Sequence, residues 1–195
     1  MPISYTNRKG RTYFLCEGTT KSGKPRYFFS RDLQDTLLEK IPDGYVIQES
    51  VNGIVSLAKS QPMLLTSAEI SVVTSAIASH PDAKAYRVDV KSKQIIIYER
   101  VGSDARRIIV DSLGMQPDGN MLLRIEKQES LYTQFTPIMR FTLVDEAKRF
   151  FCAERMRFSG EDHWITISSG KTISVIAPRF IAKLKADDFF DLFDL

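Results

Sequence analysis

Alternating apolar and polar positions, broken by short polar turns, dominate the first 60 residues. Residues 11–18 and 25–32 are rich in aromatic and β-branched side chains and flank a short polar segment, which is typical of a β-hairpin. A second hairpin is predicted over residues 44–59, where Asn52-Gly53 is the strongest turn signal in the chain. Between the hairpins, leucines at helical spacing predict a short helix over residues 32–40. The segment therefore reads as a ββαββ module.

Helical and extended patterns both occur from residue 61 onwards. Thr66 and Glu69 have capping-box spacing, so a helix is predicted to begin at Thr66 and to end before Pro81. A third hairpin is predicted over residues 85–100. Further expectations are strands over residues 106–114 and 136–145, a hairpin over 163–176, a helix that starts at Pro178, and segments 121–130 and 145–156 that fit either strand or helix.

Taken together, these patterns predict an α+β fold, made mostly of antiparallel hairpins with a few short helices. The segment 60–65 contains proline and polar residues, and we expect it to be a boundary. It separates a β-rich N-terminal module, residues 1–60, from a larger α+β domain, residues 61–195.

Composition places the chain among ordinary globular proteins, because 43% of its 195 residues are hydrophobic and 26% are charged. No apolar run approaches the ~18 residues that are needed to span a bilayer. The first residues contain no apolar segment of the kind that forms a secretory signal. Cys16 and Cys152 form no pair motif, so we expect reduced thiols. These features predict a cytoplasmic protein.

The net charge is only +3, but the charges are unevenly distributed. Residues 1–31 hold seven basic side chains against one acid, Glu17. The segment 187–195, DDFFDLFDL, holds four acids and no base. Such asymmetry indicates partners of complementary charge rather than a particular fold.

Aromatic residues alternate with the cations of the basic N-terminal segment. Cations beside rings on a small antiparallel sheet suit single-stranded nucleic acid, because the charges follow the phosphates and the rings stack on the bases. The predicted nucleic-acid-binding residues are Arg8, Lys9, Arg11, Lys21, Lys24 and Arg26. An acidic protein is the other class of partner that these charges fit. In the alternative interpretation, the rings form a core and the cations lie on its solvated face.

Residues 18–25 match seven of the eight positions of the phosphate-binding motif G-x-x-x-x-G-K-[ST]. The eighth position is Pro25, which has neither a hydroxyl group nor an N–H, and a strand pattern follows where the motif requires a helix. A hairpin turn with Gly23 at positive φ is therefore predicted. The second Ser-Gly-Lys, in SGKT at residues 169–172, has Ile165 in place of the first glycine, and we expect it to be a turn as well.

Residues suited to metal binding or catalysis are few. The chain has two histidines, His80 and His163, and none of the usual metal-ligand spacings, so no metal or cofactor is predicted. His80 ends a predicted helix, where a partial positive charge suits the helix dipole. Glu161 and Asp162 precede His163, and a carboxylate beside an imidazole can orient a general base. A hydrolase that uses this loop, with or without a divalent ion, is the enzymatic alternative.

The acidic C-terminal segment interleaves its acids with aromatic rings. Phe189, Phe190 and Phe193 are the predicted partner-binding residues, because short acidic-aromatic peptides dock their rings into pockets rimmed with bases. The stretch FFDLF is similar to the pentapeptide that binds the bacterial sliding clamp, although Phe189 stands where glutamine is expected. The alternative is that these rings pack on their own domain.

Four blocks, residues 5–31, 41–59, 80–99 and 139–167, resemble uncharacterised bacterial hypothetical proteins. The resemblance covers most of the chain, so it implies one evolutionary unit of bacterial cytoplasmic origin, and it assigns no site residues. The sequence therefore predicts a non-catalytic bacterial binding protein that contacts nucleic acid or an acidic partner through its basic hairpin. The alternatives are the hydrolase and a subunit that is recognised through its C-terminal segment.

Overall fold

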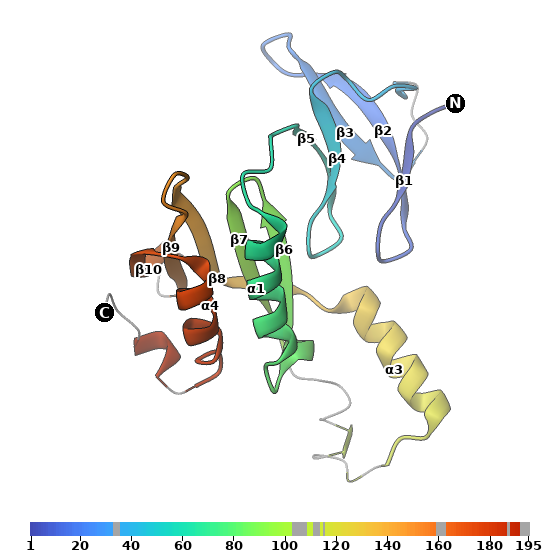
Figure 1. Ribbon diagram of the computed structural model, residues 1–195. Helices are drawn as coiled ribbons and strands as arrows, with labels where there is room; N and C mark the ends of the chain where they lie inside the picture. The colour runs from blue at the N-terminus through green and yellow to red at the C-terminus, as the bar shows by residue number, and fades with distance from the viewer. Residues whose placement is uncertain are drawn as a thin grey trace. The chain divides into compact units, whose positions relative to one another are not determined.

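The computed structural model describes residues 1–32, 36–102, 109–110, 114, 116–158, 163–186 and 188–191 (Figure 1). The described parts of residues 1–61 and 104–133 form one compact unit, and those of residues 62–103 and 134–195 form the other. Both contain antiparallel sheets, and helices complete the predicted α+β fold. No helix in the described ranges combines the length and the apolar character that a membrane span needs.

The first unit contains a three-stranded sheet of order β1-β2-β3 and a separate hairpin of β4 and β5. The predicted hairpins over residues 11–32 and 44–59 are confirmed. A helix also belongs to this unit and is capped by Asp118, whose side chain accepts a hydrogen bond of 2.7 Å from the backbone N–H of Met121. The element bounds are β1 Ser4–Thr6, β2 Thr12–Thr19, β3 Pro25–Ser30, β4 Tyr45–Glu49, β5 Val55–Lys59 and α3 Gly119–Tyr132.

The short helix predicted over residues 32–40 is wrong in its described part. Residues 36–38 pair with β2 instead: the N–H of Glu17 donates to the carbonyl of Thr36 at 2.9 Å, and the N–H of Leu38 donates to the carbonyl of Leu15 at 2.9 Å. Strand β1 pairs with only the first residues of β2. Because exposed strand edges leave backbone groups unpaired, tertiary pairing outweighs the helical spacing of the leucines here.

The two faces of the β1-β2-β3 sheet have different surroundings. Tyr5 and Tyr27 lie on one face and contact the β4–β5 hairpin; the rings of Tyr27 and Tyr45 meet edge to face at 5.5 Å. Because successive strand residues point to opposite faces, Phe14 and Phe28 lie on the other face. Both rings are partly exposed there.

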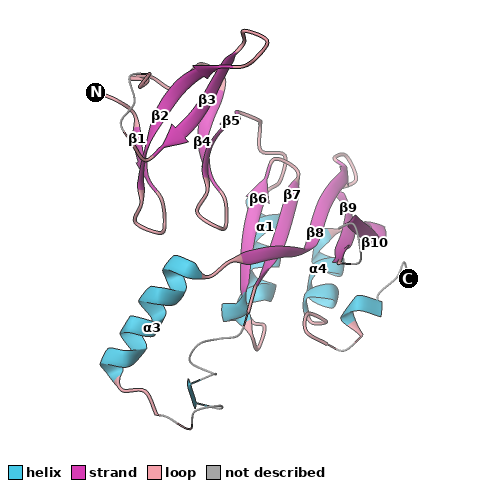
Figure 2. Cartoon of the chain, turned by 180° about the vertical axis from the view of Figure 1, so that it is seen from behind, coloured by secondary structure: helices cyan, strands magenta, loops and turns pink. Residues whose placement is uncertain are grey.

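The second unit is a two-layer structure of one five-stranded antiparallel sheet, of order β10-β9-β8-β7-β6, and two helices. Both helices lie on the same face of the sheet, as two opposite views show (Figures 1 and 2). The third predicted hairpin, β6–β7, is confirmed. The bounds are α1 Ser67–Ala78, η1 Ala83–Ala85, β6 Tyr86–Lys91, β7 Gln94–Arg100, β8 Phe135–Asp145, β9 Phe150–Arg157, β10 His163–Lys171, α4 Ile173–Ile181 and η3 Phe189–Asp191.

Residues 163–176 do not form the predicted hairpin. Strand β10 runs on to Lys171, and after the single residue Thr172 the chain enters α4, which contains Pro178 in its interior rather than at its start. The buried residues of α4 follow the helical spacing i, i+3, i+4, i+7, i+8 and are Ile173, Ile176, Ala177, Phe180 and Ile181. Burial of this continuous apolar stripe outweighs both the strand propensity of the isoleucines and the hydrogen bond lost at proline.

Helix α1 begins with the predicted capping box. The N–H of Glu69 donates to Thr66 Oγ1 at 3.3 Å, and Glu69 Oε2 accepts from the N–H of Thr66 at 2.8 Å. The same carboxylate binds Arg149 of the β8–β9 turn, whose Nε lies 2.9 Å from Oε1 and whose Nη2 bonds to Oε2. Arg149 Nη2 also donates to the carbonyl of Leu64 at 3.0 Å. One nine-tenths-buried carboxylate thus fixes the start of the helix to the sheet.

We expect Glu69→Gln to lower the free energy of unfolding by about 2–3 kcal/mol near neutral pH, because it leaves the arginine without its charged partner. Burial raises the pKa of Glu69, but hydrogen bonds from Arg149 and Thr66 outweigh burial and hold the pKa below its ordinary 4.5. Such a group stabilises the fold well above pH 4.5, and this stability is lost as the pH falls through the lowered pKa.

Urea unfolding of the wild type and Glu69→Gln across this pH range measures the effect, and the two stabilities should converge in acid. The control is Glu146→Gln, an exposed carboxylate in the turn that contains Arg149, which should change stability by less than about 0.5 kcal/mol. A constant difference between wild type and Glu69→Gln at all pH values would contradict the assignment.

Candidate functional site

The six predicted nucleic-acid-binding residues lie in two groups at opposite ends of β2. Arg8, Lys9 and Arg11 occupy the turn between β1 and β2, whereas the other three belong to the β2–β3 hairpin (Figure 1). A strand rises by about 3.3 Å per residue, so the two ends of this eight-residue strand lie roughly 25 Å apart. The basic residues therefore form two separate groups rather than one patch.

The first turn is held against the β4–β5 turn by Asn7, a residue that is 4% exposed. Its Nδ2 donates to the carbonyl of Gly53 at 2.6 Å, while Oδ1 accepts from the N–H groups of Lys9 and Arg11 at 3.0 and 2.9 Å. Both the nitrogen and the oxygen of the side-chain amide are thus hydrogen-bonded. This network is structural, since it ties two turns together and directs no polar atom outwards.

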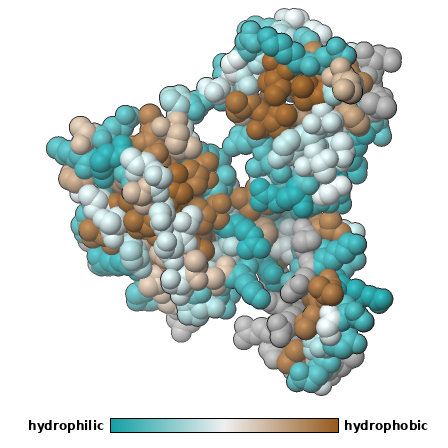
Figure 3. Space-filling model, turned by 45° about the vertical axis from the view of Figure 1, so that its right-hand side comes forward, coloured by the Kyte–Doolittle hydropathy of each residue, from teal (hydrophilic) through white to brown (hydrophobic). Residues whose placement is uncertain are grey.

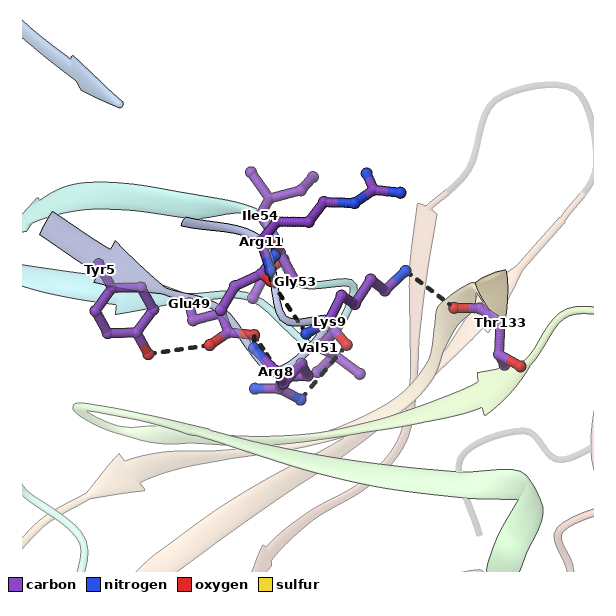
Figure 4. Close-up of polar contacts among 11 residues, drawn as sticks. Tyr5, Arg8, Lys9, Arg11, Glu49, Val51, Gly53, Ile54 and Thr133 are labelled. Atoms are coloured by element: carbon purple, nitrogen blue, oxygen red, sulfur yellow. Dashed lines mark hydrogen bonds and ion pairs between the residues drawn. The ribbon is translucent and has the colours of Figure 1, made fainter. Parts of the chain in front are cut away.

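Arg8 is engaged by a carboxylate of the same module. The Nε atom of Arg8 lies 2.7 Å from Glu49 Oε1, and the backbone N–H of Arg8 donates to the same oxygen at 3.0 Å. The hydroxyl of Tyr5 donates to Glu49 Oε2 at 3.0 Å (Figure 4). Burial raises the pKa of Glu49, but hydrogen bonds from Arg8 and Tyr5 outweigh it and lower the pKa. The carboxylate therefore stays ionised and offsets the charge of Arg8.

The two other cations of this turn differ in exposure. Lys9 is half-buried, and its Nζ lies 3.4 Å from the carbonyl oxygen of Thr133. Arg11 is exposed, and its side chain extends away from the turn (Figure 4). The first group therefore offers one exposed cation, Arg11, that makes no ion pair within the described residues.

The second group belongs to the β2–β3 hairpin, whose turn is confirmed. The N–H of Gly23 donates to the carbonyl of Thr20 at 2.9 Å, and Thr20 Oγ1 accepts from the N–H of Lys24 at 3.0 Å. Gly23 has the predicted positive φ, 79°. A strand follows the glycine-lysine pair, so this segment lacks the helix start that a phosphate-binding loop requires.

Lys21, Lys24 and Arg26 are all exposed. Across the part of the chain that the structure describes, none of the three forms an ion pair. They lie within six residues of one another at the end of a two-stranded projection. This group is the densest set of exposed, unneutralised cations among the residues that the sequence singled out.

An aromatic surface adjoins these cations. Arg26 pairs with Gly18 and Phe28 pairs with Cys16, so Arg26 and Phe28 lie on the same face of the sheet. Gly18 has no side chain, and the ring of Phe28 fills this space, since a Cβ atom on Gly18 would lie 3.2 Å from Phe28 Cε1. Apolar residues also gather on one side of this module in a space-filling view (Figure 3).

The segment SGKT, residues 169–172, differs from its expectation, because a helix follows it. Strand β10 ends at Lys171 and α4 begins at Ile173, so Thr172 alone connects them. A phosphate-binding loop needs several consecutive residues between strand and helix, so that their N–H groups surround the phosphate. One residue does not provide such a loop. This segment therefore lacks the geometry of a nucleotide site.

The two histidines have different surroundings: His80 makes structural contacts, and His163 adjoins a loop that lies outside the described residues. His80 Nε2 lies 3.2 Å from the carbonyl oxygen of Leu184, and its ring meets Tyr86 edge to face at 5.2 Å. His163 is exposed at the start of β10, while Glu161 and Asp162 lie outside the described residues. Within the described ranges, no group of three or more His, Cys, Asp or Glu residues is placed to hold a metal ion.

The three predicted partner-binding rings do not share one environment. Phe189 is 2% exposed and belongs to the core of the second unit, so it contacts its own domain. Phe190 is 52% exposed, and its ring meets Phe189 edge to face at 5.1 Å. Phe193 lies outside the described residues. Of the described rings, only Phe190 is accessible to a partner.

No model of a known protein family, no curated protein and no solved structure matches the chain. The chemistry and geometry of the chain's own side chains are therefore the basis for a functional proposal.

Cys16 and Cys152 are both free thiols, as expected.

Two glycines allow the coupling between the β1–β2 and β4–β5 turns to be tested. Gly44 and Gly53 have nearly the same φ, 80° and 79°. A Cβ atom on Gly44 meets nothing within 4 Å, whereas one on Gly53 would lie 3.2 Å from Asn7 Nδ2 and 3.2 Å from Lys9 Cδ. Gly44→Ala should therefore cost about 1–2 kcal/mol from backbone strain alone. Gly53→Ala should cost a further 1–3 kcal/mol from overpacking.

Thermal or urea unfolding of the two variants measures this difference. Equal destabilisation would show that Asn7 and Lys9 move aside freely, and it would contradict the rigid connection between these two turns.

Proposed function

We propose that the protein is a non-catalytic binding protein whose β2–β3 hairpin contacts single-stranded nucleic acid. The observation that supports this function best is the set of three exposed cations, Lys21, Lys24 and Arg26, without ion pairs among the described residues. The proposed setting is the bacterial cytoplasm, in agreement with the two free thiols.

Each part of the hairpin has a distinct role in this proposal. Lys21 and Lys24 lie in the turn on flexible side chains, which suits irregularly spaced phosphates. Arg26 lies on the strand beside Phe28, where a guanidinium contacts a phosphate while the ring contacts the adjoining base. Phe14 extends the aromatic surface along the same face. The alternation of charge and ring favours nucleic acid over an acidic protein, which offers carboxylates but no regular series of flat rings.

The β1–β2 turn contributes less to binding in this proposal than the β2–β3 hairpin does. Arg8 is neutralised by Glu49 and Lys9 contacts a backbone carbonyl, so a phosphate would have to replace existing contacts. Arg11 remains available but lies at the far end of β2. We therefore assign affinity mainly to the hairpin end, with Arg11 as a secondary contact for longer strands.

The first test reverses the charge of the hairpin turn with Lys21→Glu and Lys24→Glu together. Binding to a fluorescein-labelled single-stranded DNA, followed by anisotropy at low salt, should weaken at least tenfold. The slope of log affinity against log salt should fall by about 1.4, since each phosphate contact on a single strand contributes about 0.7.

The β6–β7 turn provides a matched control. Lys91 and Lys93 are exposed, flank Ser92 in a short hairpin turn, and allow the same change of net charge. Lys91→Glu with Lys93→Glu should leave the affinity for DNA within about twofold of the wild-type value. The twofold range allows for the weak, salt-screened long-range attraction that any change of net charge alters. Equal effects of the two double variants would show that net charge alone, and not the hairpin, governs binding.

The second test separates base stacking from charge. Phe28→Leu keeps an apolar side chain over Gly18 but removes the aromatic face. It should weaken binding of oligonucleotides by about 1 kcal/mol or more, the lower end for one stacked base. Binding of heparin, an anionic polymer without bases, should stay unchanged. Equal losses for both ligands would contradict the stacking role, and loss of heparin binding alone would favour an acidic partner.

A further inference from the structure

The two partly exposed rings on the Arg26 face of the β1-β2-β3 sheet lie well apart. Phe28 is paired with Cys16, and Phe14 lies two residues from Cys16 along β2. A strand rises by about 3.3 Å per residue and neighbouring strands lie about 4.8 Å apart, so the Cα atoms of Phe14 and Phe28 are roughly 8 Å from each other. Among the ring contacts of the described residues, these two rings do not form a pair. They are therefore two separate platforms for a ligand.

Gly18 allows the ring of Phe28 to lie away from the row of Phe14. A Cβ atom on Gly18 would be 3.2 Å from Phe28 Cε1, so this ring extends towards Gly18. Gly18 lies on the other side of Cys16 from Phe14, nearer to the hairpin turn, and it is paired with the exposed Arg26. The order along this face, starting from the turn, is thus Arg26, the ring of Phe28 and then Phe14.

This spacing does not fit a strand whose bases are stacked on one another. Successive nucleotides of a stacked strand are only about 3.4 Å apart, which is less than half of the distance between the two platforms. In such a stack, both faces of each interior base are covered by its neighbours, so only the end bases present a free face. One base on each platform therefore requires neighbouring bases to be separated from one another.

The free-energy cost of separating neighbouring bases depends on the bases. Purines have larger ring systems than pyrimidines, so runs of adenine stack more strongly than runs of thymine or uracil. A phenylalanine ring can replace the lost contact in both cases, because every base has a flat face. The smaller cost therefore favours pyrimidine runs. Single-strand binding proteins owe preferences of this kind to stacking strength and backbone flexibility rather than to hydrogen bonds with base edges.

We propose that the hairpin site selects pyrimidine-rich single strands and binds them with neighbouring bases unstacked, one base on Phe28 and one on Phe14. The inference rests on the proposed function and adds the class of strand that the same site takes. Arg26 contacts the phosphate beside the base on Phe28, and the two lysines of the turn contact phosphates beyond it. The shared chemistry of the ligands is a flexible strand of thymine, cytosine or uracil bases, in DNA or in RNA.

The experiment compares fluorescein-labelled decamers of oligo(dT) and oligo(dA) by anisotropy, with the full chain at one low salt concentration. The affinity for oligo(dT) should be at least about fivefold higher than that for oligo(dA). The same order is expected in RNA, with oligo(U) above oligo(A), and the tighter of oligo(dT) and oligo(U) identifies the sugar that the site prefers. Near-UV circular dichroism of oligo(dA) gives an independent readout, because its stacking signal should fall as the protein saturates the strand.

Ring variants test whether the two platforms cause the preference. Phe14→Leu with Phe28→Leu leaves the cations in place, so strands should still bind through their phosphates, although more weakly. The preference for oligo(dT) over oligo(dA) should fall below twofold, because no base then has to be unstacked. If this double variant does not fold, Phe14→Leu alone replaces it and should at least halve the preference. The matched control is Tyr13→Leu, which removes a ring from the opposite face of β2 and should keep the wild-type preference within twofold.

Three results would overturn this inference: equal affinities for oligo(dT) and oligo(dA), an unchanged stacking signal of oligo(dA) at saturation, or a preference that the folded ring variants retain. Failure of the nucleic-acid proposal itself gives a different pattern. If the wild type binds both decamers equally and the double variant of Lys21 and Lys24 binds both more weakly, the proposed function stands and this inference falls. If the wild type binds no decamer, both fall.

Discussion

The ion pair between Glu69 and Arg149 is the constraint on which the arrangement of the second unit depends. It joins the first turn of α1 to the β8–β9 turn, two segments far apart in the sequence. Arg149 adopts positive φ, 54°, which is uncommon for a residue with a side chain, and its bonds to Glu69 and Leu64 maintain that conformation. With α1 fixed at this point, its apolar face and that of α4 can share one face of the sheet.

Local signals in the sequence accounted for the elements that carry their own turn or cap. The β2–β3, β4–β5 and β6–β7 hairpins and the capping box of α1 follow from residues within each segment, and all four were found. The segments 32–40 and 171–176 were misassigned because their outcome depends on distant partners. Residues 36–38 form backbone hydrogen bonds with the part of β2 that β1 leaves unpaired, and the isoleucines of α4 are buried in the core.

The candidate sites show the same division between local and distant information. Sequence identified the cations of the N-terminal module but not their separation along β2, nor the engagement of Arg8 by Glu49, which comes from another hairpin. It placed rings among these cations but did not predict the distance between Phe14 and Phe28, which the pairing of β2 with β3 sets. One signal was available: the hairpin turn at Gly23 fixes this pairing, so the register of the two strands follows from the turn.

The single-residue connection at Thr172 has a consequence for how this protein can change during evolution. An α-helix turns by about 100° per residue, so one residue inserted between β10 and α4 would rotate the apolar stripe of the helix out of the core. The turn from Thr20 to Lys24 has no such restriction, because it is exposed and its length does not set the orientation of any buried element. Insertions and deletions among relatives should therefore be tolerated in the β2–β3 turn and selected against at the junction of β10 and α4.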